Sequence, residues 1–267
     1  MIGTSSYIAL GIMIAGGILL PVLVTVWWLK KSKDKLTTVL LGAATWFVFA
    51  IILETVPKLV LMNPATSLGQ AVLGSALLTT VIGALLAGIF EETGRLLVFK
   101  YLLKKRTNRE TGISHGIGHG GMEALYLLTA AGVQYLAYAI LISAGQFSEL
   151  ISAAAATGAD TSTLEAIPAA IASLTPGTAC LAVAERCFSL VLHTGLSVLV
   201  FYAVKKKQPL LYVLAILLHA LIDAPAGLYQ TGVIGNVYLV ELLVAVYALA
   251  VFLGAYFLLY KKDQKTE

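Results

Sequence analysis

The chain has 267 residues, of which 59% are hydrophobic and only 12% are charged, and its mean hydropathy is +0.89. Soluble globular domains carry roughly 25% charged residues, so this composition excludes an ordinary soluble domain and indicates a membrane protein. The net charge of +4 does not call for a nucleic-acid partner, because membrane topology and anionic lipid explain the Lys clusters.

Seven apolar stretches are long enough to cross a bilayer, which needs about 20 helical residues. A backbone in lipid must satisfy its hydrogen bonds internally, so we expect every span to be α-helical. The spans are predicted near residues 6–29, 36–61, 71–99, 114–144, 178–203, 209–228 and 236–260. The fold class is therefore all-α, a polytopic helical bundle with about seven transmembrane helices. We expect a single integral-membrane domain over 1–267, with a catalytic core at about 71–228.

Basic residues gather at alternate ends of the predicted spans. Of the 18 Lys and Arg residues, 15 lie in four clusters, at 30–35, 100–109, 205–207 and 261–265. The positive-inside rule places such clusters on the cytoplasmic side. The sequence therefore predicts that the N-terminus lies outside and the C-terminus is cytoplasmic.

The third predicted span holds three ionisable residues within five positions. Glu91, Glu92 and Arg95 lie in the string LLAGIFEETGRLLVF. One charge at the centre of a membrane helix costs about 2.5–3.5 kcal/mol, so these groups need partners, water or a function. A buried acid is also a candidate general base.

The long connection at 145–177 differs from the others. It carries acidic residues and no Lys or Arg, and its Ala-rich pieces predict one or two short amphipathic helices on the outer surface. We favour a packed connector over a lid that gates access of a substrate.

Later spans add further acids and all four histidines of the chain. The fourth span opens with HGIGHGGMEA, the fifth contains ERCFSLVLH, and the sixth contains HALID. Counting 1.5 Å per residue from the nearest basic cluster gives depths of ~8 Å for Arg95 and His119, ~12–15 Å for Glu91, Glu92, Glu123 and His219, ~18 Å for His193 and ~21 Å for Asp223. Similar depths on four helices predict one polar chamber in the cytoplasmic half of the bilayer.

Structural interpretations compete with a functional one at each position. The acidic pair with Arg95 could be an ion pair that fixes helix packing, and Glu123 could be the counter-ion of Arg95. We expect His115 at the membrane interface, and His119 could lie there too. Glu185 and Arg186 lie nearer the outer face, where we expect a membrane anchor. The shared depth of several acids and histidines favours the functional interpretation.

Two kinds of hydrolytic chemistry fit these residues. In one, Glu91 or Glu92 is a general base that deprotonates water, and His219 with Asp223 stabilises the oxyanion and the leaving group. In the other, His193, His219 and a carboxylate bind Zn²⁺, which lowers the pKa of a bound water. The sequence leaves both open, so Zn²⁺ is a candidate cofactor and no cofactor is certain.

EETGR, the helix of Glu123 and HALID resemble the three-motif pattern of the CAAX-protease/bacteriocin-processing and PrsW-like glutamic intramembrane proteases. The layout of residues ~85 to ~228 is most similar to the YhfC branch of membrane peptidases. By this resemblance Glu91 is the base, ahead of Glu92 and Glu123. The chain departs from the pattern because Arg95 follows the acidic pair by three residues instead of four.

The resemblance extends to the remaining site residues and to the kind of mechanism. It makes Glu92 or Arg95 the support of the base, matches His193 to the middle histidine, and matches His219 with Asp223 to the last motif. The YhfC branch has been described both as metalloprotease and as glutamic protease, so similarity leaves metal dependence open.

These observations together predict an intramembrane endopeptidase in a bacterial plasma membrane. Its expected partners are the lipid bilayer and a substrate that is a membrane protein or a membrane-associated peptide. The alternative is a proton-coupled transporter or a non-catalytic scaffold, because buried Glu, His and Asp also form proton relays. A lipid-modifying enzyme is a third interpretation.

Overall fold

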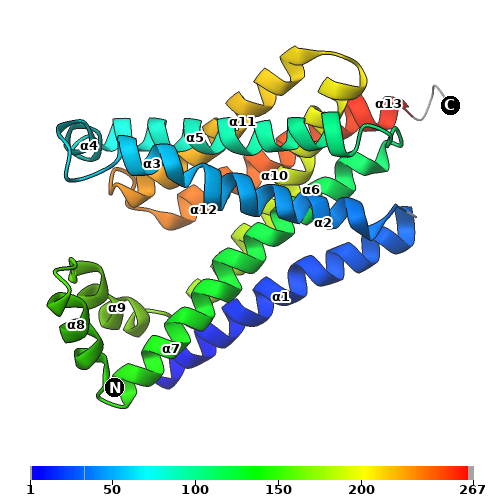
Figure 1. Cartoon of the computed structure of the whole chain (residues 1–267). Coiled ribbons are helices and arrows are strands. Elements are labelled where there is room, and N and C mark those ends of the chain that lie inside the picture. Colours follow the sequence, from blue (N-terminus) through cyan, green and yellow to red (C-terminus); the bar gives the residue numbers. More distant parts are fainter. Residues whose placement is uncertain (1, 33, 264–267) are drawn as a thin grey trace. The chain divides into compact units, whose positions relative to one another are not determined.

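The computed structural model describes residues 2–32 and 34–263, and every secondary-structure element in that part of the chain is a helix (Figure 1). Seven helical stretches there are long and apolar enough to cross a membrane. They are Thr4–Ser32, Leu36–Leu61, Ala76–Leu102, Glu110–Ser143, Pro176–Lys205, Pro209–Gln230 and Val237–Asp263. Many large apolar side chains on these helices are exposed, as expected for a surface that contacts lipid. The predicted all-α fold with seven candidate spans is confirmed.

Several of these stretches combine α-helical and π-helical segments. The elements are α1 (Thr4–Ser32), α2 (Leu36–Trp46), η1 (Phe47–Leu53), α3 (Thr55–Leu61), α4 (Ser67–Leu73), α5 (Ala76–Leu97), η2 (Val98–Leu102), α6 (Glu110–Ala124), η3 (Leu125–Ala130), α7 (Ala131–Ser143), α8 (Phe147–Ala156), α9 (Ser162–Ala172), α10 (Pro176–Lys205), α11 (Pro209–Gln230), α12 (Val237–Ala255), η4 (Tyr256–Tyr260) and α13 (Lys261–Asp263). The π-helical segments η1 to η4 lie inside otherwise continuous spans, where such widened turns are known to occur.

The described residues form two compact units. Unit 1 comprises residues 2–20 and 124–184, and unit 2 comprises residues 21–123 and 185–263. The boundaries expected for a single domain stay a prediction.

Unit 1 has its own apolar core. The core consists of Leu10, Ala139, Phe147, Ile167 and Ile171, which come from α1, α7, α8 and α9. The Tyr7 hydroxyl donates a hydrogen bond to the carbonyl oxygen of Ala139 at 3.2 Å, which ties α1 to α7. The two short helices expected in the connection 145–177 are present as α8 and α9.

Helix α10 is the central helix of unit 2. In its most apolar stretch of 18 residues, 78% of the residues are buried. Helix α6 packs closely on α10 because glycines face it. A Cβ atom on Gly116 would lie 2.5 Å from the Cα of Thr194, and one on Gly120 would lie 2.8 Å from the Cα of Leu190. Helices α5 and α11 also pair, and a Cβ on Gly88 would lie 2.8 Å from the carbonyl oxygen of Ile216. Small residues therefore allow the backbones that carry the polar side chains to approach one another.

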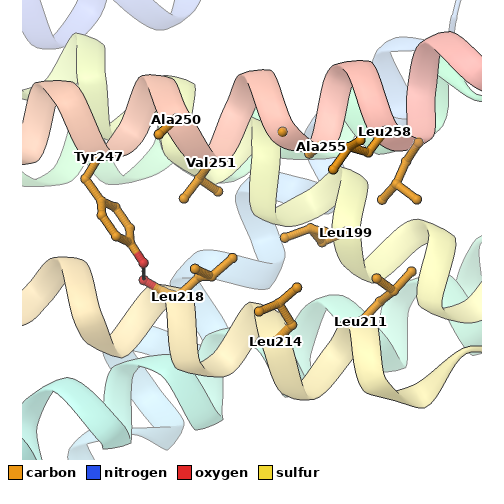
Figure 2. A pocket seen from close by; sticks show the side chains of 11 residues that line it. Leu199, Leu211, Leu214, Leu218, Tyr247, Ala250, Val251, Ala255 and Leu258 are labelled. Carbon is orange, nitrogen blue, oxygen red and sulfur yellow. Dashed lines mark hydrogen bonds between the residues drawn. The ribbon is translucent and has the colours of Figure 1, made fainter.

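An apolar cavity of about 400 Å³ lies among α10, α11 and α12 (Figure 2). Leu211, Leu214 and Leu218 line it from α11. Its one polar group, the Tyr247 hydroxyl, donates a hydrogen bond to the carbonyl oxygen of Leu218 at 3.0 Å. The cavity therefore offers only hydrocarbon to its contents.

The described parts of the four basic clusters meet at one end of unit 2, which we call the basic end. Three contacts join them: Arg106 with Asp34 at 3.6 Å, Lys205 with Asp263 at 2.6 Å, and the Tyr260 hydroxyl, which donates to Glu110 at 3.4 Å. The basic clusters that lie at alternate ends of the spans in the sequence are thus all at the same end of unit 2 in the structure.

The close contact of α6 with α10 gives a stability prediction. Gly116→Ala places a methyl group against the backbone of Thr194, and overpacking of this kind costs about 1–3 kcal/mol. We expect a lower unfolding temperature of the detergent-solubilised protein, followed by fluorescence-detected size exclusion after heating. Gly254→Ala on α12 is the matched control, because no atom lies within 4 Å of its Cβ position. Equal stability of the two variants would contradict this packing.

Candidate active site

Glutamate, arginine and histidine side chains from four helices of unit 2 meet in its interior. We call six of them the acid–histidine cluster: Glu91, Glu92 and Arg95 of α5, His119 of α6, His193 of α10 and His219 of α11. All six are buried. The ring centroids of His119 and His193 lie 4.9 Å apart, and those of His193 and His219 lie 5.4 Å apart.

Arg95 lies at the centre of the cluster and is fully buried. Its Nη1 donates to Glu92 in a close ion pair, and its Nε donates to the Ser197 hydroxyl at 3.2 Å. Its Nη2 lies 2.7 Å from Nδ1 of His193 and 3.9 Å from Oε2 of Glu91. A guanidinium has five N–H donors in a rigid plane, which suits it to hold several acceptors in fixed places.

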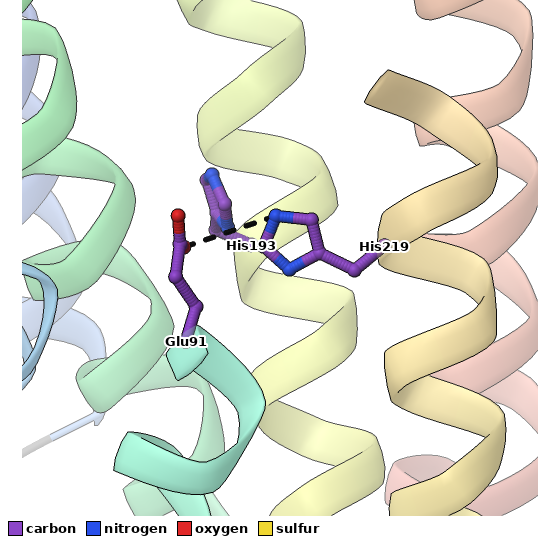
Figure 3. Close-up of side chains that lie close together, drawn as sticks. All are labelled: Glu91, His193 and His219. Carbon is purple, nitrogen blue, oxygen red and sulfur yellow. Dashed lines mark ion pairs between the residues drawn. The ribbon is translucent and has the colours of Figure 1, made fainter. Parts of the chain in front are cut away.

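His219 presents one ring nitrogen to a carboxylate and the other to open space. Its Nδ1 lies 2.7 Å from Oε1 of Glu92, which is also held by Arg95 and acts as acceptor, so Nδ1 carries the proton. Its Nε2 lies 3.8 Å from Oε2 of Glu91 and 3.6 Å from Oδ2 of Asp223, and in the neutral ring it offers its lone pair on that side. His219 is therefore oriented as a base or as a metal ligand (Figure 3).

His193 is held from both sides. Because Arg95 can only donate, Nδ1 of His193 is the acceptor and Nε2 carries the proton, which it donates to Glu123 in a close contact. Glu123 also accepts hydrogen bonds from Arg186 and, at 2.9 Å, from the Ser189 hydroxyl. Glu123 thus pairs with Arg186, and its expected role as counter-ion of Arg95 is wrong.

His119 is a member of the cluster that the sequence analysis did not count among the catalytic residues. Its Nε2 lies 2.8 Å from Oε2 of Glu91, and its buried Nδ1 has no hydrogen-bond partner among the described residues. The available signal was its spacing of four residues from both His115 and Glu123, which places the three side chains on one helix face.

His115 is fully buried inside the protein, while its expected depth near the membrane interface stays a prediction. The Thr45 hydroxyl donates to the carbonyl oxygen of Leu41 at 2.6 Å and therefore accepts from Nε2 of His115 at 3.2 Å. The Ser197 hydroxyl, 3.3 Å from Nδ1, donates there. Both ring nitrogens are occupied, so His115 has a structural role.

A polar cavity of about 140 Å³ adjoins the cluster. Its charged or imidazole lining consists of Glu91, Glu123, Glu185, Arg186, His193, His219 and Asp223. At about 30 Å³ per water, it has room for a few molecules and a carbonyl group. Glu92 and Arg95 are fully buried behind it, whereas Glu185 and Arg186, expected to be a membrane anchor, belong to its lining.

Three side chains of this lining could hold a metal ion. Ligand atoms of Glu91, His193 and His219 all lie within 4.8 Å of one another. Two His and one Glu are the protein ligands of many catalytic zinc sites, and Glu92 behind His219 is the outer carboxylate that such ligands usually have. Ligands at 2.0–2.1 Å from a tetrahedral ion lie ~3.4 Å apart, so the three would move slightly together. His193 would exchange one present contact, because a neutral ring has one lone pair.

A bundle of membrane-length helices around a buried acid–histidine cluster defines a multi-span membrane protein with a candidate metal site. The chain belongs to the YhfC intramembrane metalloprotease family, whose model matches residues 16–244. It is 33% identical over 248 residues to the uncharacterized membrane protein YhfC of Bacillus subtilis (strain 168), which covers 93% of this chain and 94% of that protein. No solved structure matches it. The predicted relation to the YhfC branch is confirmed, while the link to CAAX-type proteases stays a prediction.

The geometry around His219 predicts metal binding. We expect the purified, chelator-treated protein to bind about one equivalent of Co²⁺ or Zn²⁺, followed by the visible spectrum of Co²⁺ and by calorimetry. His219→Ala should weaken binding at least tenfold, which corresponds to ~1.4 kcal/mol. His115→Ala is the control, since this histidine has no free lone pair. Unchanged affinity in His219→Ala would exclude this site.

The pairing of Arg95 gives a second prediction. Removing one partner of a buried ion pair costs about 3–5 kcal/mol, because the other charge stays buried without compensation. We therefore expect Arg95→Gln to lower the unfolding temperature strongly. Lys100→Gln, which removes an exposed charge at the basic end, should change it little. Similar effects of the two substitutions would argue against Arg95 as the central contact.

Proposed function

We propose that this protein is a metal-dependent intramembrane endopeptidase that hydrolyses a peptide bond of a membrane protein or membrane-associated peptide. The observation that carries the proposal is the convergence of Glu91, His193 and His219 on one small polar cavity between membrane-length helices. Membership of a family described as intramembrane metalloproteases supports it.

The residues around the cavity have separate roles in this proposal. Glu91, His193 and His219 hold the ion, which when bound is a Lewis acid that polarises a carbonyl and acidifies water. Asp223 and Glu123 are two further carboxylates that line the cavity, and they can accept the proton of the attacking water and return it to the leaving amine. Arg95 and Glu92 lie behind the cavity and position the two histidines.

A mechanism without metal uses the same cavity. Here Glu91 accepts the proton of water, and His219 with Asp223 assists. The lone pair of His193, already occupied by Arg95, favours this version. Glu91 is a better base than Glu92, because Glu91 lines the cavity and Glu92 is enclosed by Arg95 and His219. Sensitivity of the cleavage to chelators separates the two versions.

The proposed setting is a bacterial plasma membrane with the basic end in the cytoplasm, the N-terminus outside and the C-terminus inside. The multi-span architecture and the bacterial relative support this setting, and the gathered basic clusters support the orientation. The cluster then lies ~8–18 Å from the cytoplasmic boundary, mostly in the cytoplasmic half of the bilayer.

N-terminal peptide profiling of membranes tests the proposal directly. We expect new peptide termini in cells that express the wild type and none with Glu91→Gln or His219→Ala at equal protein levels. Glu165→Gln on α9, an acid outside unit 2, is the control and should behave as the wild type. Identical profiles of peptide termini in all cells would contradict the peptidase proposal. In that case, a proton-driven flux in proteoliposomes that is abolished by Glu91→Gln would establish a transporter instead.

A further inference from the structure

The polar cavity extends from the acid–histidine cluster away from the basic end. On α10 it is lined from His193, ~18 Å from Lys205, to Glu185, ~30 Å from Lys205. On α11, which begins just after the basic cluster 205–207, it is lined from His219 to Ala226. The cavity thus reaches the level at which these helices leave the hydrocarbon on the other side.

Among the described residues of unit 2, buried side chains fill the space between the cluster and the basic end. Arg95 and His119 of the cluster and the neighbouring His115 are fully buried. A cavity of about 230 Å³ at the basic end is lined by Phe99 and Phe201, and the Phe99 ring lies 4.6 Å from the ring of His115 in a tilted contact.

The space beside α11 on that side is equally unsuited to a polar substrate. There the apolar cavity is lined from Leu211 to Leu218 of α11 (Figure 2), and His219 is not among its lining residues. Neither cavity gives water or a peptide a polar path to the cluster from the basic end.

Exposure rises in the opposite direction. The side chain of Glu91 is 8% exposed, that of Glu185 is 21% exposed, and that of Asp223 is 39% exposed. The mouth of the polar cavity therefore lies at Asp223 and Glu185.

The mouth carries a surplus of negative charge. Arg186 is the one Arg or Lys of the described lining and is paired with Glu123 and Glu185, while Asp223 lies 3.6 Å from His219 and within electrostatic range of Arg186. Glu241 of α12 lies within electrostatic range of Glu185, and Glu54 lies within range of Asp223 with Lys58 as its own partner. A cleft lined by one sign of charge between apolar walls raises the local concentration of the opposite sign.

We propose that the site is reached from the helix ends opposite the basic clusters, and that its acidic mouth selects substrate segments that carry Lys or Arg near the cleaved bond. This inference rests on the proposed peptidase function for its substrate. The route and the charge preference are properties of the cavity, and they can be measured without proteolysis.

Cysteine accessibility tests both parts in the full-length protein. In a Cys180→Ser/Cys187→Ser background, Ala226→Cys places a thiol in the mouth. Val233→Cys marks the loop between α11 and α12, and Gln208→Cys marks the basic end. Right-side-out and inverted membrane vesicles are treated with two membrane-impermeant methanethiosulfonates, one with a trimethylammonium group and one with a sulfonate.

We expect Ala226→Cys to react in the same vesicles as Val233→Cys and to be protected in those where Gln208→Cys reacts. For each thiol we take the ratio of its reaction rate with the cationic reagent to its rate with the anionic reagent. The ratio for Ala226→Cys should exceed that for Val233→Cys about tenfold or more, and Glu185→Gln should reduce this excess. Reaction together with Gln208→Cys would overturn the route, and a normalised ratio near one would overturn the charge selection. If the accessibility results are as expected but no proteolysis is detected, the route and the charge preference stand, and only the proposed peptidase function is contradicted.

Discussion

The burial of one guanidinium group is the constraint on which the rest of unit 2 depends. Arg95 is fully enclosed by protein, so its donors must all find acceptors, and these come from its own helix and from α10. A buried charge without such partners would cost several kcal/mol. The three helices α5, α6 and α10 therefore approach closely at this level, and glycines on α6 allow the approach. Packing and electrostatics thus specify the same arrangement.

The same group determines the protonation pattern of three histidines. Through its contact with Nδ1 it puts the proton of His193 on Nε2, and through Ser197 it does the same for His115. Through Glu92 it directs one proton of His219 to Nδ1. Of the two rings that line the polar cavity, His219 is thus the one whose neutral form has a lone pair that Arg95 does not occupy. A positive charge that never meets the substrate in this arrangement prepares the residue that would, which is a common feature of polar groups behind a reactive site.

Hydropathy and a constant helical rise were enough to predict the spans and the depth of the polar residues. Depth brought Glu91, His193, His219 and Asp223 to similar levels before any contact was known. The rotation of each helix about its axis was not predictable, because it depends on packing against neighbours. It decides that Glu91 faces the cavity and Glu92 faces Arg95, that Arg186 turns inward to Glu123, and that His115 is enclosed. Close approach through glycines, which hydropathy cannot register, explains why α6 is buried so deeply.

The composition of α6 has a consequence for how the protein is made. Its residues 112–121 include five glycines and two histidines, so this segment alone has little affinity for hydrocarbon. It packs closely on α2, which is translated before it, and on α10, which is translated about 70 residues later. One face of the segment is therefore without its protein partner until α10 has been made. The acid–histidine cluster, which needs His193 of α10 and His219 of α11, is completed only after both helices have been synthesised.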